Sequence, residues 1–356
     1  MSGTSLDAID VALVEIDGQG LEMRARFILG HSFPLRTLAK ILRPLTLQRP
    51  KPAGDIARYG VMLGMSHSVA IQKLIEQANA MPDLIGLHGQ TVYHEPPNSM
   101  QLINPHHVAL EFKVPVAFDF RGADMAAGGG GAPITPLADH VLFRDRRQTR
   151  AVLNLGGFAN YTWLPPTRKS GEAALASIRG ADICACNQLL DFIARRWFKK
   201  KYDVNGVRAS RGIVHPEAEE TLEMMLTAQA RAGRSLGTGD EATDWAKSFQ
   251  GHCSGEDLAA TACSVVGRVI AQTIGDADQV ILGGGGASNA TLLDGLRAHA
   301  KVELIESDSL GVPRQYREAV CMAVLTALAR DGVSITLPQV TGRFADCNVF
   351  PCWVNP

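Results

Sequence analysis

The sequence predicts an α/β protein, because short apolar runs typical of strands alternate with longer segments typical of helices. Several runs stop abruptly at glycine or aspartate, as buried strands do. The expected strands are 9–18, paired with 24–30, followed by 84–89, 114–120, 151–157 and 279–286. This order of elements is typical of sheets covered by helices.

Three longer segments are expected to be helices, at 215–233, 254–275 and 318–329. In the second, Ser254 with Asp257 three residues later resembles a capping pair, and Gly275 is expected to end the helix.

A length of 356 residues favours two domains. The charged segment 140–150 precedes a strand–glycine–glycine–strand unit, and each half of the chain opens with a glycine-containing loop beside a hairpin. We therefore expect an N-terminal α/β lobe over 1–145 and a C-terminal α/β lobe over 146–356.

The composition excludes several classes of partner. The chain has 35 basic and 36 acidic side chains, so no positive surplus favours nucleic acid or a membrane surface. No run approaches the ~20 apolar residues that a membrane span needs. Its first residues do not resemble a signal peptide, so we expect a cytoplasmic protein.

Seven scattered cysteines favour reduced thiols over a disulfide framework. Cys184 and Cys186 form a C-x-C pair, for which buried core residues and a metal site are the two interpretations.

Four segments combine glycine with small polar residues: 1–10, 126–133, 154–160 and 282–289. Glycine lets backbone N–H groups approach an anion closely, and a neighbouring aspartate can hold Mg²⁺. No lysine follows the glycines as a Walker A loop requires, and Asn289 stands at the third glycine position of a dinucleotide-binding fingerprint. A nucleotide would therefore be bound in another way.

The first of these segments, MSGTSLDAID, resembles the phosphate loop of the anhydro-N-acetylmuramic acid kinase family, which usually has glycine at the position of Ala8. Further blocks resemble the family in the same order: HGQTVYH (88–94), DFRGADMAAGGGGAP (119–133), NLGGFAN (154–160), YDVNG (202–206), LGGGGASN (282–289), REAV (317–320) and PQVTG (338–342). The resemblance implies a two-lobed actin- and hexokinase-like (ribonuclease H-like) fold with ATP in a central cleft. It also implies Mg²⁺ and a 1,6-anhydro sugar from recycled peptidoglycan.

The resemblance further implies site residues. Asp182 matches the catalytic aspartate. The implied nucleotide-binding residues are Gly3, Thr4, Ser5, Leu6, Asp7, Ala8, Ile9, Asp10, Asn154, Gly156, Gly157, Asn160, Gly284, Gly285, Gly286 and Asn289. The implied sugar-binding residues are His88, Gln90, Thr91, Arg121, Asp124, Asn187 and Glu318.

In such an enzyme Asp182 would be the general base for the water that opens the anhydro bridge. Alternatively, Asp182 caps a helix over the following residues. Glu318 either contacts the sugar or metal, or only complements a helix dipole. Turn chemistry alone would explain Asn154 and Asn160.

Arg121 would bind the lactyl carboxylate of the sugar, since guanidinium matches carboxylate well, or form a salt bridge to Asp124. His88 and His94 flank the G-Q-T block and either line the site or are structural.

Three features depart from the family. Cys184 and Cys186 replace loop glycines. If those positions need a positive φ or a close approach to phosphate, the Cβ atoms of the cysteines would cost roughly 1–2 kcal/mol each. Asp240 replaces an arginine in GTGDE (237–241). The family also has a strand before MSGTS, so we expect about 8 further residues upstream.

The main interpretation is therefore an anhydro-N-acetylmuramic acid kinase. The alternatives are a kinase for another anhydro sugar such as levoglucosan, or a catalytically impaired paralogue that binds ATP or sugar. The resemblance also suggests a homodimer.

Overall fold

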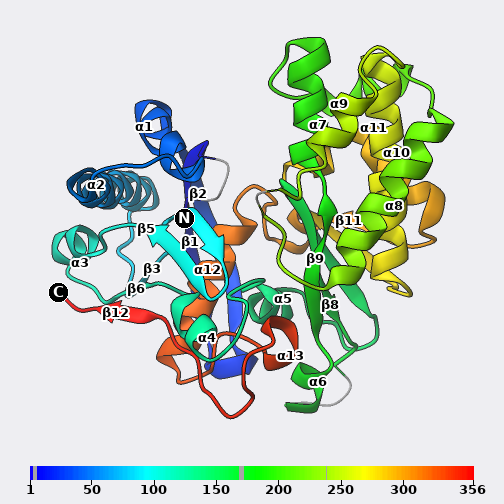
Figure 1. Ribbon diagram of the computed structural model, residues 1–356. Helices are drawn as coiled ribbons and strands as arrows, with labels where there is room; N and C mark the ends of the chain where they lie inside the picture. Colours follow the sequence, from blue (N-terminus) through cyan, green and yellow to red (C-terminus); the bar gives the residue numbers. More distant parts are fainter. Residues whose placement is uncertain (3–5, 168–171, 238) are drawn as a thin grey trace. The chain divides into compact units, whose positions relative to one another are not determined.

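The computed structural model describes residues 1–2, 6–167, 172–237 and 239–356 (Figure 1). The chain divides into two compact units. Unit 1 comprises Met1–Phe143, Gly171–Ala176 and Leu310–Pro356, and unit 2 comprises Arg144–Ser170 and Ser177–Ser309. Both units combine strands with helices, so the predicted α/β class is confirmed.

The C-terminal segment corrects the predicted assignment of 146–356 to one lobe, because Leu310–Pro356 packs within unit 1. Strand β12 (Cys352–Val354) pairs antiparallel with β6 (Val116–Phe118), and helix α12 (Arg317–Arg330) packs on β1 (Ala8–Asp17). Hydrogen bonding and apolar packing therefore return the chain to its first unit after the second is complete.

The described residues of unit 1 form three small sheets. β1 pairs antiparallel with β2, β3 lies parallel to β6 beside β12, and β4 forms a hairpin with β5. The paired strands expected at 9–18 and 24–30 are thereby confirmed. The remaining elements of the unit are β2 (Arg24–Pro34), α1 (Arg36–Thr46), α2 (Ala53–Ala78), β3 (Ile85–Leu87), β4 (Gln90–Glu95), β5 (Asn98–Leu102), α3 (His106–Phe112), α4 (Gly122–Ala126), α5 (Pro136–Phe143), α6 (Glu172–Ala176) and α13 (Pro338–Thr341).

The apolar core of unit 1 joins α1, α2 and α3 to strands β1, β3 and β6. Leu42 of α1 and Leu63 of α2 are fully buried in it, together with Val116 of β6. Among the described helices, none is long and apolar enough to cross a bilayer.

A buried carboxylate ties the glycine-rich segment after α4 to the C-terminal segment. Asp124 is fully buried and accepts hydrogen bonds from Gly131 N–H (2.8 Å), Thr336 Oγ1 (2.6 Å) and Thr341 Oγ1 (2.7 Å). The buried Arg343 guanidinium lies 3.8 Å from the same carboxylate. These contacts use Asp124 structurally, so we exclude it from the proposed sugar-binding residues.

Unit 2 is built on a five-stranded sheet with the order β11-β10-β7-β8-β9. Strands β11, β10 and β7 are parallel, while β8 is antiparallel to both β7 and β9. The elements are β7 (Arg150–Leu155), β8 (Phe158–Leu164), β9 (Arg179–Ala185), α7 (Asn187–Ile193), α8 (Pro216–Ala232), α9 (Thr243–Ser248), α10 (Gly255–Ile274), β10 (Gln279–Gly283), α11 (Ala290–His299) and β11 (Glu303–Glu306). In unit 2, short 3₁₀ or π turns lie at Ala194–Phe198, Val204–Gly206, Ala209–Arg211 and Gly285–Ser288. A further short turn lies at Gly20–Glu22 in unit 1, and another, Ser307–Leu310, lies where the chain passes from unit 2 to unit 1.

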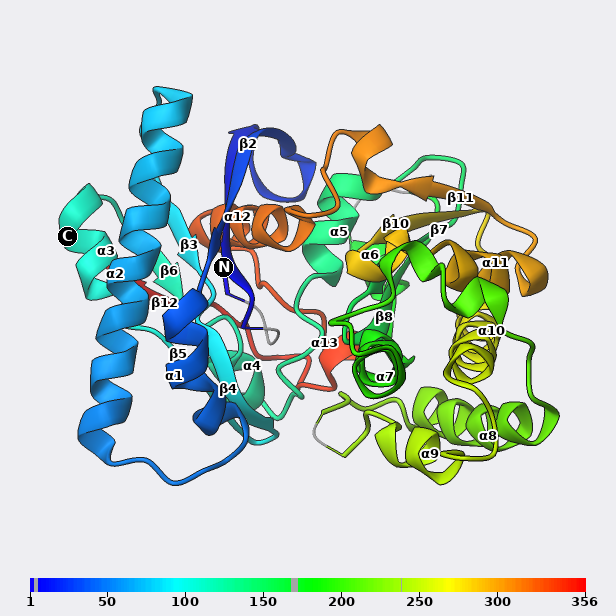
Figure 2. The ribbon, with the colours of Figure 1, turned by 90° about the horizontal axis from the view of Figure 1, so that it is seen from above.

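Helices α8, α10 and α11 lie together on one side of this sheet (Figure 2). Helix α10 confirms its sequence prediction: Ser254 Oγ accepts the Asp257 N–H at 3.0 Å, and Gly275 follows the last turn. Alternate residues of β7, namely Ala151, Leu153 and Leu155, join the same apolar core as α10. The opposite face of β7 is thereby left for polar side chains such as Asn154.

The turn after β10 passes very close to the end of β7. Gly284 has φ +78°, and a Cβ there would lie 2.7 Å from both Asn154 Oδ1 and the Leu155 carbonyl oxygen. A Cβ on the neighbouring Gly285 would meet no atom within 4 Å. The backbone at Gly284 therefore requires glycine for both conformation and space.

We expect Asp124→Asn to lower the free energy of unfolding by about 2–4 kcal/mol, because an amide group cannot satisfy all the buried donors that face it. Urea denaturation would measure this loss. Asp83→Asn, at an exposed position in unit 1, is the matched control and should change stability by less than about 0.5 kcal/mol. Equal denaturation midpoints for the two variants would contradict the structural role of Asp124.

We expect Gly284→Ala to destabilise the protein by about 2–4 kcal/mol, from positive φ and steric overlap together. Gly285→Ala is the adjacent control, since its Cβ enters open space. Thermal unfolding followed by circular dichroism would compare them. A melting temperature for Gly284→Ala as high as that of Gly285→Ala would show that the close approach is wrong.

Candidate functional site

Three predicted polar residues lie side by side on neighbouring strands of unit 2. Asn154 of β7 is directly opposite Asn160 of β8, and Asn160 is directly opposite Asp182 of β9. Gly283, the last residue of β10, flanks Asn154 on the other side. Because directly opposed residues project from the same face of a sheet, these side chains form one polar row.

A β-bulge in β9 places Asp182 in this row. Ala159 pairs with Cys184 and the next residue, Asn160, pairs with Asp182, so Ile183 is the extra residue. Ala159 and Cys184 belong to the apolar core, and the step to the next pair reverses the face. Without the bulge, Asp182 would share the face of Cys184 and point into the core.

Asp182 is not a helix cap. It lies inside β9, whereas α7 begins at Asn187 with Cys186 as its N-cap residue. The capping interpretation is therefore wrong. Asp182 is half-buried, and its Oδ2 accepts the Leu236 N–H at 2.8 Å.

The Gly156–Gly157 turn between β7 and β8 holds the start of α7. The Gly156 carbonyl accepts the Asn187 N–H, and the Gly157 carbonyl accepts those of Cys186 and Gln188, each at 3.0 Å. The Asn187 side chain donates to the Leu155 carbonyl at 2.9 Å. Asn187, predicted to bind sugar, thus lies beside two glycines predicted to bind nucleotide.

The Gly285–Ser288 turn completes this end of the sheet. A Cβ on Gly286 would lie 2.8 Å from Leu155 Cβ and 3.0 Å from Asn187 Oδ1. The first N–H groups of this turn are those of Gly285 and Gly286. They have no acceptor within the turn and are therefore suited to binding an anion.

Asn289 has a structural use, in contrast to its predicted contact with a nucleotide. Its Oδ1 accepts the Leu292 N–H at 3.1 Å and so caps α11, and its Nδ2 lies 3.8 Å from Cys263 Sγ. The side chain is therefore directed into the fold.

The two departures at Cys184 and Cys186 do not strain the loop. Cys184 lies in β9, Cys186 has φ −131°, and neither is among the described residues with positive φ. Both thiols are fully buried in the core, and burial raises the pKa of each. Neither position has the positive φ on which the predicted cost depended, so that cost does not arise from the backbone, and the core interpretation of the pair is supported. All seven cysteines are free, as expected.

The N-terminal loop belongs to unit 1, and its residues Gly3, Thr4 and Ser5 lie outside the described part of the chain. Leu6 and Ile9 are buried in the core, so they could offer a ligand only backbone atoms. Ala8 begins β1 and is half-buried.

The two aspartates of this loop have different surroundings. Asp7 is exposed, whereas Asp10 is half-buried and accepts a hydrogen bond from Ser32. Burial raises the pKa of Asp10, so a nearby cation would be favourable there.

His88 and Arg121 lie together beside this loop. Ser2 N–H donates to the His88 carbonyl at 3.0 Å, and Arg121 Nε lies 3.4 Å from His88 Nε2. Arg121 Nη1 also donates to the Gly131 carbonyl at 2.6 Å. Burial, reinforced by the Arg121 guanidinium, lowers the pKa of His88 to about 3 and that of His94 to about 4.

The remaining predicted sugar-binding residues also lie in unit 1. Gln90 is buried and Thr91 half-buried at the start of β4, which begins two residues after His88. Glu318 is half-buried in the first turn of α12, where it complements the helix dipole. Asp10 and Glu318 both interact electrostatically with the Met1 amino group, which brings the start of α12 close to the N-terminal loop.

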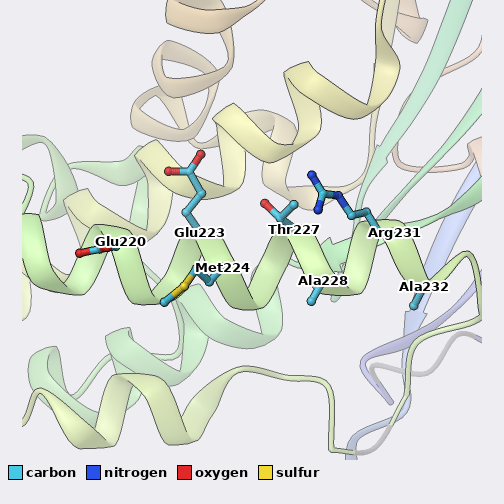
Figure 3. A pocket seen from close by; sticks show the side chains of 7 residues that line it. All are labelled: Glu220, Glu223, Met224, Thr227, Ala228, Arg231 and Ala232. Carbon is cyan, nitrogen blue, oxygen red and sulfur yellow. The ribbon is translucent and has the colours of Figure 1, made fainter.

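Within the described ranges, no cluster of three or more His, Cys, Asp or Glu side chains has an arrangement that would hold a metal ion. A separate surface hollow of about 670 Å³ lies along α8 (Figure 3). It is lined by Glu220, Glu223, Met224, Thr227, Ala228, Arg231 and Ala232. None of these is a predicted site residue, so the hollow is distinct from the polar row.

Sequence reasoning missed three residues around Asp182 and its strand: Leu236 and Arg234, which interact with Asp182, and Gln229, which contacts Ala185 of β9. Leu236 acts through its backbone, which carries no sequence signal. Arg234 forms an ion pair with Asp240. The one sequence signal for the loop that holds both residues was Asp240 itself, which stands where the family usually has arginine.

Comparisons with known proteins agree with the motifs. The family model for anhydro-N-acetylmuramic acid kinase matches residues 1–349. Among solved structures, component A of (R)-2-hydroxyglutaryl-CoA dehydratase from Acidaminococcus fermentans aligns with 90% of this chain and 99% of its own. Its sequence identity is 12% and the TM-score is 0.43, too low to support a conclusion about the site.

Curated relatives share far more sequence. A protein named anhydro-N-acetylmuramic acid kinase from Salinibacter ruber is 32% identical over 97% of this chain and 92% of its own length. A protein of the same name from Bacillus cereus is 32% identical over 96% of this chain and 94% of its own. The chain therefore belongs to the anhydro-N-acetylmuramic acid kinase family.

Proposed function

We propose that this protein uses ATP to phosphorylate 1,6-anhydro-N-acetylmuramic acid while opening its anhydro ring with water. The product is N-acetylmuramic acid 6-phosphate, formed in the cytoplasm during peptidoglycan recycling. The observation that carries the proposal is the polar row Asn154, Asn160 and Asp182 beside the glycine turns of unit 2. It supplies a carboxylate next to backbone suited to phosphate.

In the proposed reaction Asp182 takes a proton from the water that attacks C1 of the sugar. A bond forms from the water oxygen to C1 as the C1–O6 bond breaks. O6 then bonds to the γ-phosphorus of ATP as ADP leaves. Asp182 is half-buried, and the hydrogen bond from the Leu236 N–H orients its carboxylate.

The residues present fit a magnesium nucleotide. The Gly156–Gly157 and Gly284–Gly286 turns would approach the phosphates through their backbone, and Asn154 and Asn160 would add amide groups. Asp7 and Asp10 would hold Mg²⁺, directly or through water, and the raised pKa of Asp10 is consistent with a cation site. When bound, Mg²⁺ neutralises charge on the transferred phosphoryl group.

Arg121 and His88 are proposed to bind the sugar, together with Gln90, Thr91, Asn187 and Glu318. The Arg121 guanidinium suits the lactyl carboxylate that distinguishes this sugar from levoglucosan. The low pKa of His88 keeps its ring neutral near pH 7, so it would act as a hydrogen-bond partner and not as an acid.

We expect Asp182→Asn to lower kcat by about 10²–10⁴-fold, because the amide cannot accept the proton of the attacking water. The measurement is sugar-dependent ADP release with Mg-ATP and 1,6-anhydro-N-acetylmuramic acid, with levoglucosan in parallel. Nucleotide affinity, measured by calorimetry, should stay within about three-fold since Asp182 reacts with water and not with ATP.

Asp294→Asn, at an exposed position on α11, is the control and should match the unmodified protein. If the protein turned over levoglucosan and not 1,6-anhydro-N-acetylmuramic acid, levoglucosan would take the place of the proposed substrate. ATP binding without turnover of either sugar would instead favour an impaired paralogue.

A pH dependence of stability follows from the buried histidines. Burial lowers the pKa of His67 and His88 to about 3, below their ordinary value of 6.5. Stability from these neutral rings is thus fully present above about pH 6.5 and is lost as pH falls towards 3. We expect His88→Gln to reduce the slope of unfolding free energy against pH, between about pH 4 and 6, by about 1.4 kcal/mol per pH unit.

Urea titrations at several pH values would measure this slope. His106→Gln, at an exposed position, should leave the slope unchanged. An unchanged slope in His88→Gln would mean that His88 is not buried as a neutral ring.

A further inference from the structure

The loop between α8 and α9 contains an ion pair next to Asp182. Arg234 Nη1 and Nη2 donate to the two carboxylate oxygens of Asp240, at 2.8 and 2.6 Å. Arg234 is 57% exposed, whereas the Asp240 side chain is only 15% exposed. Two parallel hydrogen bonds give this pair a defined geometry that a single surface contact lacks.

The ion pair closes the loop around the residue that touches Asp182. Asp240 Oδ2 also accepts the Gly237 N–H at 2.9 Å. The preceding residue, Leu236, is buried and donates its N–H to Asp182 Oδ2 at 2.8 Å. Asp240 thus contacts Arg234 before Leu236 and Gly237 after it, and these two contacts set the position of the Leu236 N–H.

A second contact anchors this loop to the strand that carries Asp182. Gln229 of α8 accepts the Ala185 N–H of β9 at 2.9 Å and donates to the Asp240 carbonyl at 2.7 Å. Strand β9 is at the edge of its sheet, and Gln229 satisfies one of its outward backbone groups. The loop is therefore fixed to β9 on both sides of the bulge, at Asp182 and at Ala185.

The charges of the loop also act on Asp182. The pKa of Arg234 is raised, chiefly by its hydrogen bonds to Asp240, with a further contribution from the Asp182 carboxylate. Because this interaction is mutual, the Arg234 guanidinium favours ionised Asp182, the form that a general base requires.

We propose that Arg234 and Asp240 are positioning residues, which hold the Leu236 N–H against Asp182 and so fix the orientation of the catalytic carboxylate. This inference rests on the proposed function of Asp182 as general base. The inference also explains why an aspartate can stand at position 240, where the family usually has arginine. Asp240 pairs with the arginine at position 234, and we call this ion pair the clasp.

A purely electrostatic role makes a different prediction from a positioning role. Removing the positive charge of Arg234 disfavours ionised Asp182, whereas removing the negative charge of Asp240 favours it. Electrostatics alone would therefore move the acid limb of the pH profile in opposite directions and leave the plateau of kcat unchanged. Loss of the clasp lowers the plateau in both variants, because a misdirected base costs rate at every pH.

The test compares Arg234→Gln, Asp240→Asn and the double variant with Arg297→Gln. Arg297 is a matched control, since its side chain is 56% exposed and pairs with Asp294 on the surface of α11 in the same unit. We expect each single variant to lower plateau kcat by about ten- to a hundred-fold, with the KM for ATP within about two-fold of the unmodified value. The double variant should lose about as much as either single one, because both residues act through one contact.

Hydrogen exchange gives a readout that does not depend on turnover. The Leu236 amide should exchange faster in Arg234→Gln and Asp240→Asn, and in Arg297→Gln it should remain protected. Kinetic constants and exchange equal to those of Arg297→Gln would overturn the proposal.

Two outcomes separate this inference from the proposed function. Full activity of Asp182→Asn would refute Asp182 as the base and, with it, the catalytic purpose of the clasp. Absence of sugar-dependent turnover in the unmodified protein would refute the proposed function, and unchanged Leu236 exchange in both variants would then refute the clasp itself.

Discussion

The close approach of the turn after β10 to the end of β7 is the constraint on which the site of unit 2 depends. The Leu155 carbonyl lies at the centre of it: Asn187 donates to this oxygen, and a Cβ on Gly284 would collide with it. Only glycine fits there, so the backbone of Gly284–Gly286 lies directly beside Asn154. Helix α11 then starts from the cap at Asn289, and the polar row of Asn154, Asn160 and Asp182 extends from the same edge.

Asp124 and Asp182 both end an R-G-A-D sequence, at 121–124 and 179–182, yet the two carboxylates have different surroundings. Asp124 follows a strand and an arginine, yet it is fully buried among donors from Gly131, Thr336 and Thr341. Its hydrogen-bonding capacity is used to hold the C-terminal segment in unit 1. Asp182 lies on an edge strand, half-buried, where one loop N–H orients it. Complete burial therefore shields Asp124 from any ligand, whereas the half-buried Asp182 keeps the exposure that the proposed base requires.

The cysteines at 184 and 186 illustrate the same dependence on position. In a left-handed turn a Cβ would strain the backbone, but Cys184 is in a strand and Cys186 has negative φ. Both side chains fill the core beneath the polar row, where they add apolar contact. Backbone strain at this loop therefore gives no reason to expect an impaired enzyme.

The α/β class, most of the strands and capped helices, the glycine turns and the family could all be predicted from the sequence. These features depend on local periodicity, capping and turn chemistry, which neighbouring residues specify. The place of 310–356 in unit 1 could not be predicted, because it depends on the pairing of β12 with β6, which are far apart in the sequence. The structural use of Asp124 could not be predicted either, because its hydrogen-bond donors include the distant Thr336. The bulge at Ile183 and the clasp of Arg234 with Asp240 also arise only in the folded chain, since a strand register and a backbone donor leave no pattern in the letters of a sequence.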